Sequence, residues 1–281
     1  LITPLQSVQN IPLIQTLPEN SFGRHCFRVP SASAGREFIA VLYAIMSDVH
    51  ANIDALEKVL EKIDTLGVDH IICLGDVVGY NATPNECVEL LAARDIQTIL
   101  GNHDAVACGL EEPWGFNPVA LAAAIWTREQ LSDESGEWLY SLPDSLSYGH
   151  FTCVHGAPKN HNVYLFAWED TLPHKYFLEE QNCNICFMGH THMPVIFAEE
   201  GPVPVTGNSP MKLEQGKPYF INPGSVGQPR DENAAASFAL FNPDELIYEL
   251  VRVPYDTERA SKRVRDAELP PFLAERLVLG R

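Results

Sequence analysis

Short apolar runs separated by polar segments predict a series of buried strands from residue 38 onward. Phe38–Met46, His70–Leu74 and Gln97–Leu100 are rich in apolar residues, which is typical of strands that are covered on both faces. Between these runs, residues 54–67 and 83–94 carry the spacing and the end signals of helices, including a capping box with proline at Thr83–Glu86. The alternating order of strand and helix predicts a parallel sheet with right-handed crossovers.

The second half of the chain is richer in predicted strands, with proline and glycine between them. The expected strands are Phe151–Val154, Asn184–Met188, Pro194–Phe197, Tyr219–Ile221, Ser237–Phe241 and Leu246–Val253, and the expected helices are 117–131, 132–142, 257–267 and 271–279. Residues 1–37 show no sustained period and are interpreted as an N-terminal extension of unknown role. Residues 38–281 are expected to form a single α/β domain, with two sheets packed between helices.

The composition is that of an ordinary globular protein. Of the 281 residues, 46% are hydrophobic and 20% are charged, which excludes a mainly disordered chain, a collagen-like fibre and a coiled coil. A chain of this length can bury a core without help from a disulfide or a metal ion. A metal site in it would therefore serve the function of the protein rather than its folding.

The net charge of −18, from 19 basic and 37 acidic residues, argues against a protein that coats DNA or RNA. A small anionic substrate stays compatible with this charge, because bound cations can reverse the field inside a pocket. The chain shows no membrane span and no secretory signal, and its seven cysteines are irregularly spaced. We therefore expect a cytoplasmic protein with no membrane and no long nucleic acid as partner. The oligomeric state is left open.

Polar side chains follow five of the predicted strands at the point where each strand ends. They are, in chain order, Asp48, His50, Asp76, Asn102, His103, Asp104, His155, His190 and His192. Because ligands bind outside the carboxyl ends of strands in an open α/β sheet, we expect these side chains to meet in one cleft. Carboxylate, imidazole and amide groups without a thiolate suit Mn, Fe, Zn, Co or Ni rather than Ca. Each histidine alone would be more typical of a surface or core position, but their joint placement favours a metal site.

The clusters resemble the signature of the calcineurin-like metallophosphoesterase family. They are Asp48-x-His50, Gly75-Asp76, Gly101-Asn102-His103-Asp104, His155 and Gly189-His190-x-His192. The resemblance runs from about residue 39 to about residue 253. It implies a four-layer α/β/β/α sandwich of two mixed sheets flanked by helices, with a dinuclear metal site at the carboxyl ends of the strands. It also implies a metal-dependent phosphoesterase, in which a hydroxide that bridges the two ions attacks phosphorus in line.

The resemblance further implies a role for each candidate residue. One ion would be held by Asp48, His50, Asp76 and His192, and the other by Asp76, Asn102, His155 and His190. His103 would contact the phosphoryl or leaving-group oxygen, as transition-state stabiliser or as general acid. Asp104 either orients His103 or caps backbone amides of its own turn. Mn is the favoured ion, with Fe, Zn, Ni and Co as alternatives.

One motif departs from the pattern of the serine/threonine protein phosphatases of this superfamily. Their Gly-Asp is followed by Asp-Arg-Gly, whereas this chain has Gly79 and Tyr80 in place of the second aspartate and the phosphate-binding arginine. The segment resembles the prokaryotic phosphodiesterase branch, as does the stretch Asn222–Arg230. The resemblance therefore implies a small phosphorylated substrate of the phosphodiester or dinucleotide type.

Arg230 offers a planar fork for a phosphate and is a candidate substrate-binding residue together with Asn222, Tyr80 and Asn81. A surface arginine beside a tight turn is the alternative interpretation. Residues 105–150 or so resemble a helical insert of bacterial family members, which could roof the pocket. A phosphomonoesterase or serine/threonine phosphoprotein phosphatase is the alternative enzyme. A non-catalytic protein-interaction scaffold is a remote alternative.

Overall fold

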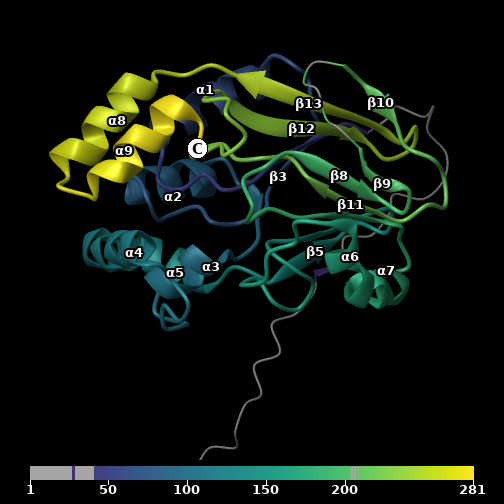
Figure 1. Ribbon diagram of the computed structural model, residues 1–281, viewed down its shortest axis with the longest axis horizontal. Coiled ribbons are helices and arrows are strands. Elements are labelled where there is room, and N and C mark those ends of the chain that lie inside the picture. The colour runs from purple at the N-terminus through teal and green to yellow at the C-terminus, as the bar shows by residue number, and fades with distance from the viewer. Residues whose placement is uncertain (1–26, 29–40, 204, 206, 208) are drawn as a thin grey trace, which may run out of the picture.

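The computed structural model describes residues 27–28, 41–203, 205, 207 and 209–281, arranged as two sheets with helices on both outer sides (Figure 1). The six-stranded sheet has the order β10-β13-β12-β2-β3-β4, and the seven-stranded sheet has the order β1-β5-β6-β7-β11-β8-β9. In the first, β2, β3 and β4 are parallel while β12 runs antiparallel to β2. In the second, β6, β7 and β11 are parallel while β5 and β8 run antiparallel to them. Both sheets are thus mixed, as predicted.

The strands are β1 (Phe27–Arg28), β2 (Tyr43–Met46), β3 (His70–Cys73), β4 (Gln97–Thr98), β5 (Ser145–Ser147), β6 (Thr152–Val154), β7 (Ile185–Phe187), β8 (Val195–Ala198), β9 (Gly201–Val203), β10 (Met211–Lys212), β11 (Tyr219–Asn222), β12 (Ala236–Asn242) and β13 (Ile247–Val253). The helices are α1 (Ile53–Asp64), α2 (Pro84–Ala93), α3 (Asn102–Ala107), α4 (Pro118–Gln130), α5 (Asp133–Tyr140), α6 (Trp168–Thr171), α7 (Lys175–Gln181), α8 (Thr257–Asp266) and α9 (Pro271–Leu279).

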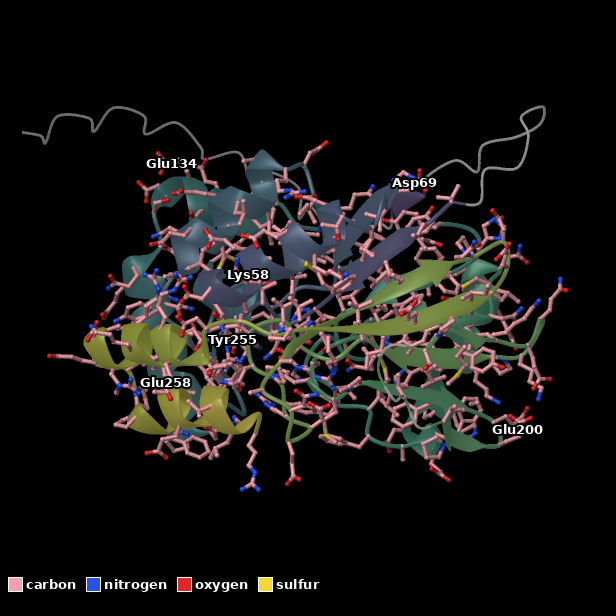
Figure 2. All side chains as sticks on the ribbon, turned by 90° about the horizontal axis from the view of Figure 1, so that it is seen from above. Lys58, Asp69, Glu134, Glu200, Tyr255 and Glu258 are labelled. Atoms are coloured by element: carbon pink, nitrogen blue, oxygen red, sulfur yellow. The ribbon has the colours of Figure 1, made fainter. Side chains whose placement is uncertain are left out.

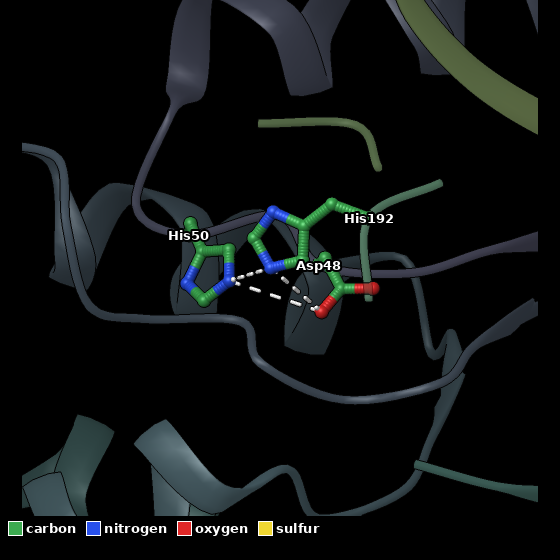
Figure 3. A group of neighbouring side chains, drawn as sticks. All are labelled: Asp48, His50 and His192. Carbon is green, nitrogen blue, oxygen red and sulfur yellow. Dashed lines mark hydrogen bonds and ion pairs between the residues drawn. The ribbon is translucent and has the colours of Figure 1, made fainter. Parts of the chain in front are cut away.

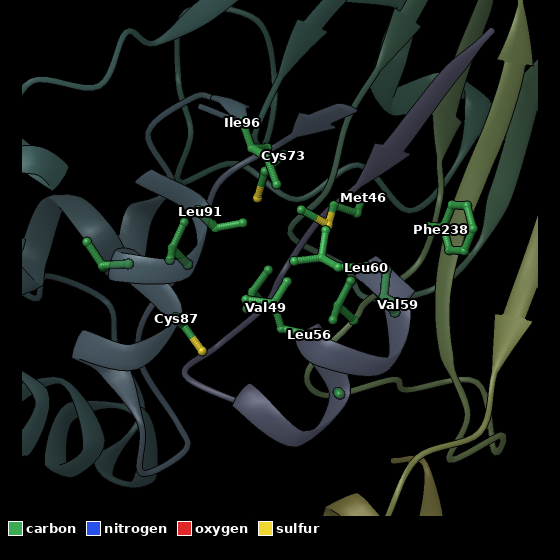
Figure 4. Packing of buried hydrophobic residues seen from close by; sticks show 14 of the residues in the cluster. Met46, Val49, Leu56, Val59, Leu60, Cys73, Cys87, Leu91, Ile96 and Phe238 are labelled. Carbon is green, nitrogen blue, oxygen red and sulfur yellow. The ribbon is translucent and has the colours of Figure 1, made fainter. Parts of the chain in front are cut away.

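Alternating side chains along each strand produce the four layers. In β2, Ile45 points between the two sheets, whereas Met46 points to the side covered by α1 and α2. Figure 4 shows Met46 among apolar side chains of α1, including Leu56 and Leu60. In β7, Phe187 lies between the sheets and Cys186 faces the outer cluster that includes residues of α6 and α7. Because successive side chains of a strand point to opposite faces, the two central sheets are covered on both sides, which confirms the predicted four-layer sandwich.

The acidic side chains are spread over the molecule rather than gathered in one place. Figure 2 shows Asp69, Glu134, Glu200 and Glu258 at well-separated positions around the ribbon. Within the part of the chain that the structure describes, no helix combines the length and the apolar composition that a membrane crossing requires.

The structure differs from the sequence-based expectations mainly at short elements. The strands β5, β9 and β10 and the helices α3, α6 and α7 were not predicted, because most of them are too short to show a period. The predicted capping box at Thr83 is wrong: its hydroxyl donates to the carbonyl of Ala51 (2.7 Å) and accepts from the amide of Ile53 (3.1 Å).

Within the predicted extension 1–37, the described residues are those of β1, which pairs with β5. The other residues of the extension and residues 38–40 of the first predicted strand lie outside the described part.

Candidate metal centre

The seven candidate metal ligands converge from both sheets onto one buried site. Asp48, His50, Asp76 and Asn102 follow β2, β3 and β4 of the six-stranded sheet, and His155, His190 and His192 follow β6 and β7 of the seven-stranded sheet. Every one of them is buried. Three groups have donor atoms that lie within 4.8 Å of one another: Asp48 with His50 and His192, His50 with Asp76 and His103, and Asp76 with His155 and His190.

Backbone strain accompanies this convergence. Asp48, His50, Asp76, His190 and His192 all have positive φ angles, between 47° and 69°. For residues other than glycine this region costs of the order of 1–3 kcal/mol each and persists where the surrounding structure imposes it. Main-chain hydrogen bonds supply that constraint: the amides of Asp48 and His50 donate to the carbonyls of Gly75 (3.0 Å) and Asp76 (2.8 Å). The strain is concentrated where side chains must turn into the site.

Asp76 occupies the centre of the group. Its Oδ2 lies 3.5 Å from Nε2 of His50 and 3.3 Å from Nε2 of His155, while its Oδ1 accepts from the amide of His103 (2.8 Å). Gly101 lets Asp76 come this close, because a Cβ at Gly101 would stand 2.1 Å from Oδ1. The buried Oδ2 has no hydrogen-bond partner among the described residues, so this carboxylate faces both halves of the site with a free oxygen.

Three of the imidazoles are oriented by backbone carbonyls. Nδ1 of His50 donates to Val78 (3.0 Å), Nδ1 of His155 to Leu74 (2.8 Å) and Nδ1 of His192 to Gln228 (2.7 Å). A carbonyl oxygen can only accept, so each Nδ1 carries the proton, and in the neutral ring Nε2 presents a lone pair. Carbonyls that fix the tautomer in this way are the usual support of metal-binding histidines.

The lone pairs of these nitrogen atoms lie so close to one another and to neighbouring oxygen atoms that a cation between them would be stabilising. Nε2 of His50 and Nε2 of His192 lie only 3.0 Å apart, and Oδ1 of Asp48 lies 3.3 Å from Nε2 of His192 (Figure 3). Nε2 of His155 lies 3.1 Å from Oδ1 of Asn102, and the buried Nε2 of His190 has no hydrogen-bond partner among the described residues. Acceptor atoms that face one another without protons repel, and a divalent ion between them removes that repulsion. The donor set therefore fits metal ions with N and O ligands.

The pKa values of Asp76, His155 and Asp48 are shifted because these charged groups are buried close together. Burial opposes ionisation of Asp76, but the neighbouring charges of His155 and His103 hold its pKa well below the ordinary value. Burial would lower the pKa of His155, yet the negative charge of Asp76 raises that pKa to about 9. Burial raises the pKa of Asp48 to about 7, with the charge of Asp76 adding to the effect. A metal ion would take the place of the proton that these groups otherwise share.

His103 lies beside this group, against aromatic rings. Its ring centre is 4.4 Å from that of Tyr80, 4.7 Å from that of Phe116 and 4.9 Å from that of His50. Gly79 makes room for it, since a Cβ there would stand 2.5 Å from Nδ1 of His103. Burial, opposed by Asp76, lowers the pKa of His103 to about 4. The imidazole is therefore neutral at pH 7 and can donate one hydrogen bond.

Asp104 caps its own turn, the second of the two roles that the sequence left open. Oδ1 accepts from the amide of Val78 (3.0 Å) and Oδ2 from the amide of Gly101 (3.0 Å). The buried Nδ1 of His103 has no hydrogen-bond partner among the described residues, so the predicted orientation of His103 by this carboxylate is not what the contacts show. Asp104 instead ties together the loops that carry Asp76 and Asn102.

We expect Asp104→Ala to lower the free energy of unfolding by about 2–4 kcal/mol, because two buried amides lose their acceptor. Asp104→Asn keeps one acceptor oxygen and should cost about half as much. Urea denaturation measures the effect, with Asp266→Ala as control, since Asp266 is exposed and forms an ion pair with the exposed Lys262. A loss no larger than that of the control would contradict the capping role.

The four candidate substrate-binding residues fall into two kinds. Tyr80 and Arg230 border the site: the ring centre of Tyr80 lies 4.5 Å from that of His50 and 5.5 Å from the guanidinium carbon of Arg230. Asn222 and Asn81 are buried, and their amides donate to the carbonyls of Gly189 (2.7 Å) and His50 (2.7 Å). Direct contact of these two asparagines with substrate stays a prediction, but the contacts present are those of residues that position ligand loops.

Sequence reasoning missed two contributors next to the ligands. Tyr164 stacks on His190 with ring centres 3.7 Å apart, and nothing in its surrounding sequence marks it. Gln228 accepts from Nδ1 of His192 through its carbonyl and from Nη2 of Arg230 through Oε1 (3.0 Å). Its place inside the stretch 222–230 was the available signal.

The predicted helical insert borders the site. It contains α4, α5 and the second half of α3, and Phe116 brings it into contact with His103. A cavity of about 540 Å³ extends from His155 between Ala105, Leu110 and Glu111 of this segment and the loop of residues 157–162. The insert thus flanks the space beside the candidate ligands.

Comparison with known proteins agrees with this geometry. Residues 41–245 match the calcineurin-like phosphoesterase superfamily domain. An uncharacterized protein of Methanocaldococcus jannaschii is 36% identical over 244 residues, covering 85% of this chain and 98% of that protein. The crystal structure of a metallophosphoesterase from Sphaerobacter thermophilus is 37% identical with a TM-score of 0.76, covering 86% of this chain and all of that one. A hypothetical protein from Pyrococcus horikoshii shares the fold, with 22% identity, a TM-score of 0.71 and coverage of 86% and 99%.

The extent of the family match, together with buried donor groups at the carboxyl ends of both sheets, leads to one assignment: the chain belongs to the calcineurin-like phosphoesterase superfamily, a family of metal-dependent phosphoesterases.

Proposed function

We propose that this protein hydrolyses small phosphodiesters, dinucleotides among them, with two divalent metal ions as cofactors and Mn²⁺ as the first choice. The proposal builds on the family and on the donor set. Asp48, His50 and His192 would hold one ion, and Asn102, His155 and His190 the other, with Asp76 shared between them. When bound, such ions lower the pKa of a water molecule and neutralise charge on a phosphoryl group.

The residues around the donor set would bind and orient the phosphate. His103, neutral because burial lowers its pKa to about 4, would donate a hydrogen bond to an oxygen that gains charge in the transition state. Arg230 would bind a second oxygen, and its guanidinium is held in place by Oε1 of Gln228, 3.0 Å from Nη2. Both groups are fixed before substrate arrives, so little reorganisation is needed during the reaction.

One observation favours a diester: the walls around His103 are aromatic. Tyr80 and Phe116 lie against the imidazole at 4.4 and 4.7 Å between ring centres. Gly79 and Tyr80 stand where protein phosphatases of this superfamily would have an aspartate and an arginine. A monoester carries an extra negative charge, which an uncharged aromatic wall does not stabilise. A diester carries an organic group instead, which suits an apolar aromatic wall.

The test compares kcat/KM for bis(p-nitrophenyl) phosphate and p-nitrophenyl phosphate in Mn²⁺, with the same leaving group in both. We expect the diester to be favoured at least about tenfold, since a tenfold ratio requires about 1.4 kcal/mol of differential transition-state stabilisation. A clear preference for the monoester would overturn the proposal in favour of a phosphomonoesterase. Absence of turnover with Mn, Fe, Zn, Co and Ni, together with capture of a stable protein partner, would support the scaffold alternative.

We further propose that the protein acts in a reducing compartment such as the cytoplasm, on a small phosphorylated molecule rather than a long nucleic acid. No disulfide joins any of the six cysteines among the described residues, which supports the first part. The net charge of −18 supports the second, because long polyanions are repelled while a small anion can be drawn in by the cations of the site.

A further inference from the structure

Two arginines and two aromatic rings surround the candidate metal centre without belonging to its donor set. We call Arg230 and Arg276 the arginine pair, and Tyr164 and Phe166 the ring stack. Arg230 stands in the loop after β11, and Arg276 stands in the last turn of α9. The ring stack belongs to the loop that follows β6.

Helix α9 is fixed beside the site by its apolar face and by its end. Leu273, Ala274 and Leu277 belong to the same buried cluster as Tyr80. The carbonyl of Gly280 accepts from the amide of Glu232 (2.8 Å), which ties the end of the helix to the loop that carries Arg230. Figure 1 shows the C-terminal end beside the middle of the molecule, next to loops that leave the central strands. Arg276 therefore has a fixed place near Arg230.

Among the described residues, neither member of the arginine pair bonds to an Asp or Glu side chain. Other arginines of this acidic chain do: Arg252 pairs with Asp231, and Arg263 with Asp54. Within the described residues, Arg230 donates to Gln228 and Arg276 to the main-chain oxygen of Arg281, and neither pairs with a carboxylate side chain. Burial lowers the pKa of Arg276 to about 10, and the charge of Arg230 adds to this effect. Two half-buried guanidinium groups that repel each other are stabilised by an anion with several oxygens, such as linked phosphates.

The ring stack offers a flat apolar face beside the site, since Tyr164 lies on His190 with ring centres 3.7 Å apart. The rings of Tyr164 and Phe166 are nearly parallel, with an angle of 5° and centres 5.4 Å apart. Phe166 is 63% exposed, although its backbone is held by a hydrogen bond from its amide to Oδ2 of Asp170 (2.9 Å). The charge of Arg276 and the hydroxyl of Tyr164 interact electrostatically, so the stack and the arginine pair border the same space. An exposed, fixed phenyl ring is suited to stacking with a nucleobase.

We propose that the arginine pair and the ring stack form a subsite for a nucleoside diphosphate unit, in which Arg276 binds the second phosphate and Phe166 stacks on the base. The inference rests on the proposed function and narrows it: the substrate is a nucleotide that contains two or more linked phosphates. A simple phosphodiester occupies only the metal centre and Arg230. Arg276 and Phe166 are thus specificity-determining residues rather than groups that take part in bond cleavage.

The test measures binding to the full chain loaded with Mn²⁺ by isothermal titration calorimetry, with the same free Mn²⁺ in both solutions. Three probes separate the contributions: AMP, adenosine 5′-(α,β-methylene)diphosphate and methylenediphosphonate, which has no nucleoside. We expect Arg276→Gln to weaken both diphosphonate probes at least about tenfold and AMP less than about twofold, since only the second phosphate loses its charged hydrogen-bond partner. We expect Phe166→Ala to weaken the nucleoside diphosphonate about tenfold while leaving methylenediphosphonate unchanged.

Arg265→Gln is the matched control, because Arg265 is exposed on α8; it should change none of the three affinities. Thermal unfolding of each variant shows whether α9 stays packed. Equal weakening of AMP and the diphosphonates by Arg276→Gln, or no weakening, would overturn the subsite. Turnover of bis(p-nitrophenyl) phosphate in the same preparations tests the proposed function separately. The expected binding pattern without turnover would contradict the proposed function but support the subsite. Turnover without the expected binding pattern would support the proposed function but contradict the subsite.

Discussion

His103→Ala should lower kcat by about 10²–10⁴ while the protein keeps its full content of metal. The imidazole is buried and held between Tyr80 and Phe116, and its backbone amide donates to Asp76, so it is placed before the substrate binds. Removal of one such preorganised donor, or of a general acid, costs this much in other hydrolases. Mass spectrometry tests whether the metal content is unchanged, and kcat on the favoured ester tests whether turnover falls.

The leaving group distinguishes the two roles of His103. As a general acid it would matter less for p-nitrophenol than for a more basic alcohol, whereas as a donor to the phosphoryl oxygen it would matter equally for both. A neutral ring favours the second outcome. His150→Ala serves as control because His150 is exposed. Retained kcat in His103→Ala would refute any direct role in the reaction.

Asp76→Asn should abolish binding of both metal ions at micromolar concentration and reduce activity at least about a thousandfold. The free Oδ2 lies 3.5 Å from His50 and 3.3 Å from His155, which places it between the two groups of candidate ligands. An amide at this position supplies no negative charge and brings two N–H donors into a site of acceptor atoms. Metal stoichiometry after dialysis is the measurement, and the expected value falls from two to nearly zero.

Asp48→Asn is the matched comparison, because Asp48 belongs to only one group of candidate ligands. It should lower the stoichiometry from two ions to one. The same stoichiometry for both variants would contradict the shared position of Asp76. The buried pair of His50 and His192, with Nε2 atoms 3.0 Å apart, should also make either variant less stable to heat, since ion binding stabilises the folded state.

The sequence was sufficient for the parts of the fold that repeat a pattern. Strands such as His70–Cys73 and helices such as Ile53–Asp64 show their period directly, and the polar residues after each strand mark the edge where they meet. That the candidate ligands lie together could therefore be predicted. Their tautomers could not, because Nδ1 of His155 depends on the carbonyl of Leu74, 81 residues away along the chain.

The surroundings of the site were harder to predict for a similar reason. Tyr164 and Arg276 lie in segments with no motif, and they reach the site only through the packing of a loop and of α9. Asp104 shows the same limit within a single turn: the spacing allowed two roles, and its bond to the amide of Gly101 decided between them. Contacts between distant segments depend on tertiary packing, which local patterns do not encode.

The layer between the two sheets sets the distance between the candidate ligands of one sheet and those of the other. Four candidate ligands come from one sheet and three from the other, so each ion would bind residues of both sheets. Phe151, Phe187 and Phe241 fill that layer, with ring centres 5.5, 5.5 and 5.2 Å apart. These phenyl rings therefore act as spacers between the candidate ligands of the two sheets. A change in their volume would alter metal affinity and turnover without changing a single ligand. Substitutions in the protein interior could therefore change the reaction rate during evolution.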